Sequence, residues 1–250
     1  MMNKNIIIIG ATSSIAEHCA RTWLSEAPVK LTLVGRDLQK LQSIQNDLQI
    51  KYPHSTISSR VTDFFDPSAI QTFVQEIAKT ETLDLCFIAH GFLPEQKKCE
   101  QDLKLCNDTL QINGISPILF AEAFANVLEK QNKGTLAIIS SVAGDRGRKS
   151  NYIYGAGKAL INSYIQGLQH RFGQHPDIHI AVIKPGPTDT PMTTRFKQQG
   201  MKMATPQEVA NIIVKSLKNK KSNIYAPTQW KYIMGVVKHI PSGIFNKINL

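Results

Sequence analysis

The sequence predicts an α/β protein whose core is a doubly wound, parallel sheet of about seven strands flanked by helices. Short apolar segments are expected as strands at 5–9, 31–34, 57–62, 83–89, 135–140 and 178–183. Helical stretches alternate with them near 14–26, 37–51, 67–79, 101–130, 152–173 and 206–218. This alternation is typical of parallel sheets, and 250 residues are enough for one large domain with a substantial core.

The first predicted strand leads into a turn of small residues that resembles a phosphate-binding turn. Residues 6–9 are all isoleucine, as expected for a strand buried on both faces, and the segment 10–16 (GATSSIA) opens the next helix. Gly10 is its sole glycine, and Ser14 stands where a second glycine is usual. The hydroxyls of Thr12, Ser13 and Ser14 can compensate as donors, so the turn predicts a dinucleotide site. The alternative is a tight turn without a ligand.

The residues after the second strand bear on which dinucleotide binds. In a dinucleotide fold this position meets the adenosine ribose, where an acid favours NAD and an arginine suits a 2′-phosphate. Arg36 therefore favours NADP(H), with NAD(H) as the alternative. Asp37 looks more like the N-cap of the next helix. Asp63 ends the third strand, where it could bond the adenine amine.

Three residues further along the chain form a set suited to carbonyl reduction. Tyr154 and Lys158 are four residues apart, so a helix over 152–170 places them on one face. A nearby cation favours a phenolate, which predicts that Lys158 lowers the pKa of Tyr154. Ser141 ends a predicted strand, so its hydroxyl is expected at the carboxyl edge of the sheet, where open α/β folds bind ligands. Alone, a tyrosine–lysine pair of this spacing is usually a surface contact.

Charge is concentrated in the last quarter of the chain. From Arg195 onward there are ten Lys or Arg and one acid, Glu208, so this part carries +9 of the formal net charge of +10. The segment 228–250 mixes cations with aromatic and aliphatic residues, which indicates an amphipathic, basic C-terminal extension. Contact with a membrane or lipid substrate, completion of the core, and a nucleic-acid patch are three interpretations. We expect no nucleic-acid partner, because no such motif is present.

The composition indicates the cellular compartment in which the protein is expected. No segment reaches about 18 consecutive apolar residues, so no transmembrane span is predicted. The four cysteines (Cys19, Cys86, Cys99 and Cys106) lack the spacing of metal ligands and are expected to be free thiols, which indicates a cytoplasmic protein. Because of the basic extension, a cytoplasmic protein in peripheral contact with the inner face of the membrane is the alternative. No metal site is predicted.

These motifs, in this order, resemble the short-chain dehydrogenase/reductase family over essentially the whole chain. The matching segments are 10–16, Asp63, Asn113 in QING, Ser141 in SSVAG, Tyr154 with Lys158, and the PGPTDT segment at 185–190. The sequence departs from the family in Ile88-Ala89-His90-Gly91, where Asn-Asn-Ala-Gly is frequent, and in its glycine-poor first turn.

The resemblance implies a Rossmann-type domain over 1–227 and a role for each matching residue. Tyr154 exchanges a proton with the substrate oxygen, Lys158 holds the nicotinamide ribose, and Ser141 orients the carbonyl. Asn113 fixes a water that links Lys158 to solvent. Residues 191–205 form a mobile substrate lid, and a homodimer or homotetramer is implied. The implied cofactor residues are Gly10, Thr12, Ser13, Ser14, Ile15, Arg36, Asp63, Ala89, His90, Gly91, Tyr154, Lys158, Pro185, Gly186, Thr188 and Thr190.

A narrower resemblance points to a substrate class. Segments 89–96, 144–151 and 224–245 are similar to the branch that contains the reductases of decaprenylphosphoryl-2-keto-pentofuranose. In the segment between Ser141 and Tyr154, the cations Arg146, Arg148 and Lys149 either face an anionic substrate or form an exposed loop with incidental charge. The sequence therefore predicts an NAD(P)-dependent reductase of a ketone, with a keto sugar, free or lipid-linked, as the expected substrate. The alternative is a catalytically degenerate dinucleotide-binding regulatory or scaffold protein.

Overall fold

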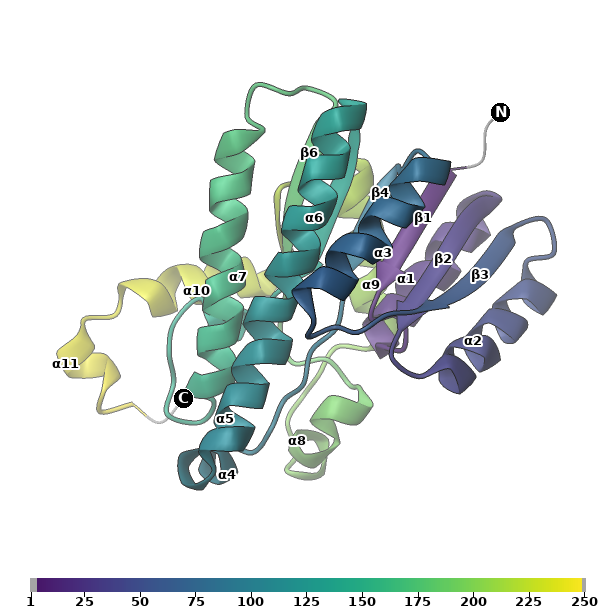
Figure 1. The fold of residues 1–250 in the computed structure, drawn as a ribbon. Coiled ribbons are helices and arrows are strands. Elements are labelled where there is room, and N and C mark those ends of the chain that lie inside the picture. The colour runs from purple at the N-terminus through teal and green to yellow at the C-terminus, as the bar shows by residue number, and fades with distance from the viewer. Residues whose placement is uncertain (1–3, 249–250) are drawn as a thin grey trace.

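The computed structural model describes residues 4–248 and is built on a parallel sheet of seven strands (Figure 1). The strand order is β3-β2-β1-β4-β5-β6-β7, so the chain reverses direction across the sheet between β1 and β4. The strands are β1 (Lys4–Ile9), β2 (Val29–Gly35), β3 (Thr56–Val61), β4 (Leu85–Ile88), β5 (Gly134–Ile139), β6 (Ile178–Pro185) and β7 (Asn223–Ala226). The six strands placed from the sequence are confirmed to within two residues at each end.

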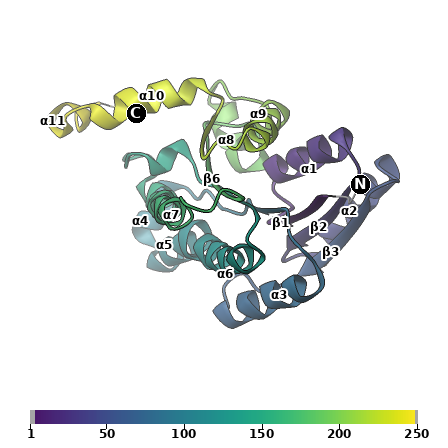
Figure 2. The same ribbon diagram turned by 90° about the horizontal axis from the view of Figure 1, so that it is seen from above.

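Helices cover both faces of the sheet (Figure 2). One face carries α1 (Ser14–Glu26), α2 (Leu38–Lys51) and α9 (Pro206–Lys218), and the other carries α3 (Pro67–Thr80), α6 (Ser116–Gln131) and α7 (Tyr152–Arg171). The four isoleucines of β1 alternate between the two cores: Ile6 and Ile8 face the first, Ile7 and Ile9 the second. All four are fully buried, which explains why this strand is apolar throughout rather than alternating.

The single helix predicted over 101–130 is wrong, because the chain is interrupted twice there. Helix α4 (Gln96–Gln101) ends at Asp102, whose carboxylate accepts hydrogen bonds from the backbone N–H groups of Lys104 and Leu105 and so caps α5 (Leu103–Leu110). A π-helical turn over Gln111–Ile115 then separates α5 from α6. This turn contains Asn113, one of the predicted site residues.

The C-terminal extension continues from the sheet as two helices. Strand β7 pairs with β6, and α10 (Gln229–His239) and α11 (Ser242–Phe245) follow it. Met234 of α10 is buried, whereas Tyr232 and Val236 of the same helix are 71% and 68% exposed. The described part of the extension therefore has a buried and an exposed side; positions 249 and 250 of the predicted extension lie outside the described residues. Between residues 4 and 248, no helix combines the length and the apolarity that crossing a bilayer requires.

Candidate active site

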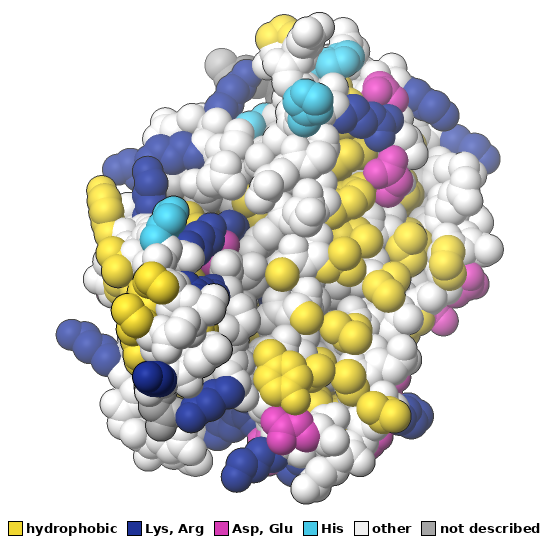
Figure 3. Space-filling view, turned by 90° about the vertical axis from the view of Figure 1, so that its left-hand side faces the viewer, with side chains coloured by type: hydrophobic (Ala, Val, Ile, Leu, Met, Phe, Trp, Pro, Cys, Tyr) yellow, Lys and Arg dark blue, Asp and Glu magenta, His cyan; other side chains and the backbone are white. Residues whose placement is uncertain are grey.

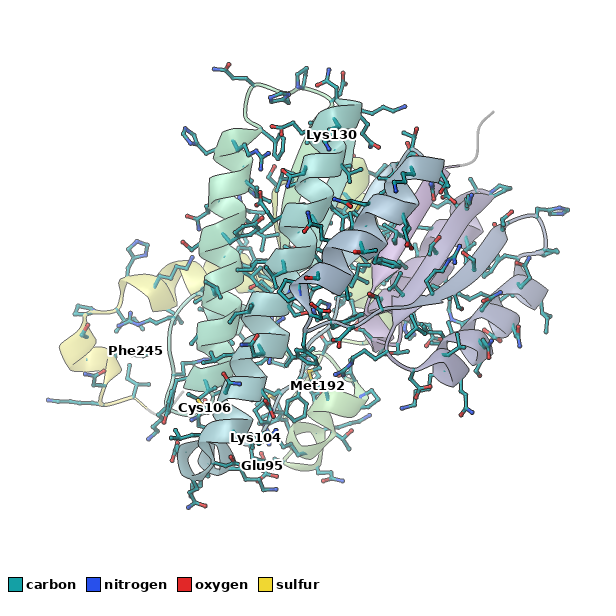
Figure 4. All side chains as sticks on the ribbon, viewed as in Figure 1. Glu95, Lys104, Cys106, Lys130, Met192 and Phe245 are labelled. Carbon is teal, nitrogen blue, oxygen red and sulfur yellow. The ribbon has the colours of Figure 1, made fainter. Side chains whose placement is uncertain are left out.

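A cavity of about 750 Å³ opens at the carboxyl edge of the sheet, where the strand order reverses. Side chains from the loops after β1, β2, β4, β5 and β6 line it, with Met192 of the predicted lid among them (Figure 4). Most predicted site residues meet in this cavity: Gly10, Thr12, Ser13, Ser14, Ile15, Arg36, Ala89, His90, Gly91, Ser141, Tyr154, Lys158, Pro185, Gly186, Thr188 and Thr190. Asp63 and Asn113 do not line it.

The turn after β1 shows why its one glycine stands at position 10. Gly10 has a φ of +82°, a conformation that other residues rarely adopt. A Cβ there would lie 2.6 Å from the backbone nitrogen of His90. Ser13 is the N-cap of α1 and makes no side-chain cap bond, so its hydroxyl does not satisfy the first N–H groups of the helix. The turn therefore ends at a helix N-terminus that lines the cavity.

The charged residues after β2 have separate roles. Arg36 lines the cavity, and its guanidinium carbon lies 5.6 Å from the centre of the Phe65 ring. Asp37 accepts a hydrogen bond from the backbone N–H of Lys40, which confirms it as the N-cap of α2 and lowers its pKa. Asp37 therefore caps α2, and Arg36, the residue after β2, is the charged side chain of this turn that lines the cavity.

His90 is a neutral, buried part of the cavity wall. Burial, reinforced by the charges of Lys158 and Arg36, lowers the pKa of His90 to about 3. Its Nε2 is hydrogen-bonded to the Ser116 hydroxyl at 3.0 Å, while its buried Nδ1 has no partner within 4–248. The ring packs edge-on against Phe64, so this departure from the usual family motif has an aromatic, well-packed setting.

Ser141, Tyr154 and Lys158 converge as predicted from their spacing. The Ser141 hydroxyl lies close enough to the Tyr154 phenol to favour its ionised form, and the Lys158 Nζ lies 5.8 Å from the centre of the Tyr154 ring. Lys158 is 2% exposed and donates to the carbonyl oxygen of Ile139 at 3.1 Å. Ser140 donates to the Lys158 carbonyl at 3.0 Å and so ties β5 to α7.

The protonation of this set differs from the sequence prediction. Burial raises the pKa of Tyr154 to about 12, and the hydrogen bond with Ser141 opposes that shift without cancelling it. The net shift is opposite to the predicted one, because desolvation disfavours the phenolate. Burial also lowers the pKa of Lys158 to about 7. At neutral pH the protein's own groups therefore keep the phenol protonated and the lysine close to its midpoint.

The two predicted residues outside the cavity use their side chains in local structure. The Asn113 amide accepts from the Phe92 N–H at 2.9 Å and donates to the Phe92 carbonyl at 2.7 Å. It thereby holds the loop after β4 against the π-helical turn. The Asp63 carboxylate accepts from the Phe65 N–H at 2.7 Å. The water and adenine contacts predicted for these residues stay predictions.

The comparisons identify the family to which this fold and site belong. A profile of the short chain dehydrogenase family matches residues 4–200. The chain belongs to this family. It is 23% identical over 245 residues to an uncharacterized oxidoreductase of Streptomyces coelicolor from the mprA 5′ region, covering 98% of this chain and 96% of that one. The chain is thus an oxidoreductase.

Solved structures of the family have the same fold. A short-chain dehydrogenase from Sphingobium yanoikuyae in complex with NADPH has a TM-score of 0.80 at 18% identity, covering 98% of this chain and 96% of that one. A short chain dehydrogenase from Burkholderia cenocepacia J2315 in complex with NADP has a TM-score of 0.82 at 14% identity, covering 99% and 98%. These likenesses extend across the seven strands and into the C-terminal extension.

In this dehydrogenase the C-terminal extension forms part of the cavity wall, which the sequence did not predict. Trp230 of α10 lines the cavity and lies against Gly186, the residue after β6. A Cβ on Gly186 would collide with the Trp230 indole, 2.0 Å from its Nε1. No periodicity or motif in the sequence joins these two positions, since their contact depends on how α10 folds back after β7.

The loop between β5 and α7 anchors the extension, and it corrects part of the cationic-loop prediction. The Arg146 guanidinium donates to the carbonyls of Val237 and Ile240 at 2.6 Å each and to that of Lys238 at 3.2 Å. It also lies 3.8 Å from the centre of the Phe245 ring. Arg146 therefore caps the end of α10 rather than facing a substrate, and Lys149 is exposed. Arg148 does line the cavity.

Beneath this loop, Asp145 is the centre of a buried polar network. Its carboxylate pairs with Lys184 of β6 at 2.6 Å and accepts from the Tyr225 hydroxyl of β7 at 2.6 Å. Lys238 of α10 approaches the same carboxylate at 3.3 Å. The Asp145 side chain is 1% exposed, so the network joins the loop, the sheet edge and the extension in one low-dielectric contact.

Proposed function

We propose that this dehydrogenase reduces a ketone to a secondary alcohol with NADPH, and that Tyr154 supplies the proton. The observation that carries the proposal is the meeting of Ser141, Tyr154 and Lys158 in the cavity that also contains the phosphate-binding turn. A proton donor, a hydroxyl for the carbonyl oxygen and a cation thus face the space beside a dinucleotide site.

The residues of the cavity fit a nicotinamide dinucleotide. The uncapped N-terminus of α1 and the hydroxyls of residues 12–14 suit a pyrophosphate, and the close approach of Gly10 to His90 keeps the turn tight. Arg36 suits a 2′-phosphate, which favours NADP(H) over NAD(H). Residues 185–188, Thr190 and Lys158 line the cavity beyond the turn, where we place the nicotinamide and its ribose. The bound cofactor supplies the hydride.

The pKa values suit the reductive direction. Because burial raises the pKa of Tyr154 to about 12, the phenol stays protonated at neutral pH and is available to donate to a carbonyl oxygen. Ser141 holds that oxygen through its hydroxyl. Lys158, when protonated, stabilises the phenolate left after donation, since an opposite charge nearby favours the ionised phenol. Proton donation therefore depends on all three side chains.

For the substrate, we propose a keto sugar, free or linked to a polyprenyl phosphate. One support is the sequence likeness of segments 89–96, 144–151 and 224–245 to reductases of such lipids. The other is the set of apolar side chains in the cavity lining, which includes Phe64, Met192 and Trp230. The exposed apolar side chains of α10, beside Lys231 and Lys238, suit the interface of an anionic membrane. We place the enzyme in the cytoplasm, with peripheral contact at the inner membrane face. Loss of co-sedimentation with anionic vesicles in a Tyr232→Ser/Val236→Ser double variant tests that contact.

For assembly, we propose a homodimer or homotetramer through the helices that carry Asn113 and Tyr154. Hydrophobic side chains gather on the side of the molecule that carries α7 and α11 (Figure 3). Leu103, Tyr152 and Leu160, on α5 and α7, are 83%, 42% and 42% exposed. Exposed apolar side chains on neighbouring helices are typical of a subunit interface. Light scattering of a Leu103→Lys/Leu160→Lys variant, expected to be monomeric, tests this assembly.

The test of the function compares Tyr154→Phe with Tyr152→Phe, an exposed tyrosine on the same helix. We expect the Tyr154→Phe protein to reduce ketones at least 1,000-fold more slowly, because it lacks the general acid and the electrostatic stabilisation that the phenol provides. NADPH is expected to bind to it as it does to the wild type. Tyr152→Phe keeps the wild-type rate. Fluorescence titration with NADPH and NADH measures cofactor choice, and Arg36→Asp is expected to reverse it. A Tyr154→Phe protein with near-normal turnover contradicts the mechanism, and binding without any turnover in the wild type favours the scaffold alternative.

A further inference from the structure

Arg148 is a cation in the cavity wall that no carboxylate among residues 4–248 neutralises. Its Nε is buried and has no hydrogen-bond partner among residues 4–248, and no carboxylate within that range pairs with its guanidinium. Burial lowers the pKa of Arg148, since the charge is desolvated without compensation. A guanidinium stays charged at any pH at which proteins fold, so the unmet charge is a permanent feature of this wall.

The surrounding loop contrasts with it, because every other charge there has a local role or lies in solvent. Arg146, two residues earlier, makes three hydrogen bonds to the end of α10. Asp145, the one acid of the loop, is held by Lys184 and Tyr225. Lys149 is exposed. Arg148 is partly buried, and a charge in that setting without a counter-ion among the described residues costs stability. Such a residue is typical of a site whose counter-ion is the ligand.

The position of Arg148 in the chain indicates which part of the cavity its anionic ligand would occupy. Arg148 follows β5 and precedes α7, the two elements that supply Ser141 and Tyr154. The phosphate-binding turn follows β1, and Arg36 follows β2, on the far side of β4 in the sheet order. The cofactor's phosphates thus have their own donors, and Arg148 is left for a different anion.

We propose that Arg148 binds an anionic group of the substrate, so that the ketone reduced by this enzyme carries a phosphate ester. A guanidinium donates two parallel hydrogen bonds to phosphate oxygens, which fixes the distance between the anion and the reacting carbonyl. This assignment rests on the proposed ketone reduction and names its substrate class and the residue that selects it. A free sugar phosphate and a lipid phosphodiester present the same oxygens, so the probes below separate the two.

The first experiment measures kcat/KM with NADPH for three probes: D-ribulose, D-ribulose 5-phosphate, and a ketopentose whose phosphate is esterified to a short isoprenyl alcohol. We compare the wild type with Arg148→Gln, Arg148→Lys and the control Lys149→Gln, which removes the same charge from the exposed neighbour. The wild type is expected to prefer phosphorylated probes at least 10-fold. Arg148→Gln abolishes that preference, Arg148→Lys keeps part of it, and Lys149→Gln keeps all of it. Preference for the monoester or the diester identifies the source of the phosphate.

A second measurement is independent of turnover. In the Tyr154→Phe protein with NADP⁺ bound, calorimetry of D-ribulose 5-phosphate is expected to show binding that Arg148→Gln weakens at least 10-fold. If the wild type turns over no ketone but this binding holds, the proposed reduction fails and the anion site stands. If neutral ketones are reduced and Arg148→Gln changes no phosphate preference or binding, the anion site fails and the reduction stands.

Two further outcomes overturn the assignment. If Arg148→Gln weakens the affinity for NADPH by the same factor as the affinity for D-ribulose 5-phosphate, Arg148 binds the cofactor and not the substrate. A lower melting temperature in Arg148→Gln would mean a structural role; the proposal expects no loss, because the variant removes a partly buried charge that has no counter-ion among residues 4–248. A melting temperature at or above that of the wild type, with selective loss of phosphate recognition, supports it.

Discussion

Replacing Arg146 with methionine is expected to release the C-terminal extension from the body of the enzyme. The wild-type guanidinium donates to three backbone carbonyls at the end of α10 and stacks 3.8 Å from the centre of the Phe245 ring. Hydrogen bonds from a charged group contribute about 1.5–3 kcal/mol each, and the contributions of one side chain do not add fully. A loss of about 3 kcal/mol in the local stability of α10 is a cautious total.

Hydrogen–deuterium exchange measures that loss directly. A loss of about 3 kcal/mol corresponds to roughly 100-fold faster exchange wherever the amide opens locally, because each 1.4 kcal/mol is a factor of ten. We expect this acceleration in amides of Gln229–His239, whereas amides of β1 keep their protection. Lys149→Met is the matched control, since it removes an exposed cation from the same loop. Unchanged exchange in α10 of Arg146→Met would refute the assignment of Arg146 as its anchor.

Two further predictions concern buried charges. Asp145→Asn leaves Lys184 unpaired in a buried site, so we expect a loss of about 3–5 kcal/mol and a melting temperature lower by about 10 °C by calorimetry. Asp189→Asn, which breaks the exposed pair with Lys197, is expected to change it by less than 2 °C; equal effects of the two variants would argue against burial as the cause. Because burial lowers the pKa of Lys158 to about 7, this lysine is protonated below that pH and neutral above it. The value of kcat/KM for ketone reduction should therefore fall as pH rises through about 7, and a flat profile from pH 6 to 9 would contradict the role of its charge.

Much of the sheet could be predicted because each strand carries its own signal. Residues 6–9 are apolar on both faces, and the observed strand buries them in two separate cores. The four-residue β7 has no comparable signal, since Asn223 and Tyr225 interrupt its apolar pattern, so a seventh strand was expected but not located. Likewise, the periodicity of 101–130 conceals the local cap at Asp102. It also conceals the π-helical turn, where Asn113 contacts the loop after β4.

The site was predictable where neighbours in sequence are also neighbours in space. Tyr154 and Lys158 share a helix face, and Gly10 stands where a positive φ is required. Desolvation was not predictable, because the sequence does not show how deeply a side chain is buried. For that reason the pKa of Tyr154 was expected to fall and instead rises. The roles of Arg146 and Trp230 were equally hidden, since both depend on a helix that returns to the sheet from the end of the chain.

The contact between Trp230 and Gly186 separates two kinds of change that this enzyme can undergo. Tyr154, the proposed proton donor, lies on α7, whereas one wall of the cavity is formed by a helix from the last tenth of the chain. Mutations in that helix can widen, narrow or recharge the chamber without touching the chemistry. Changes confined to the C-terminal end can therefore alter the shape of the cavity while α7 stays unchanged, and a tag or fusion at that end is attached close to a helix that lines the cavity.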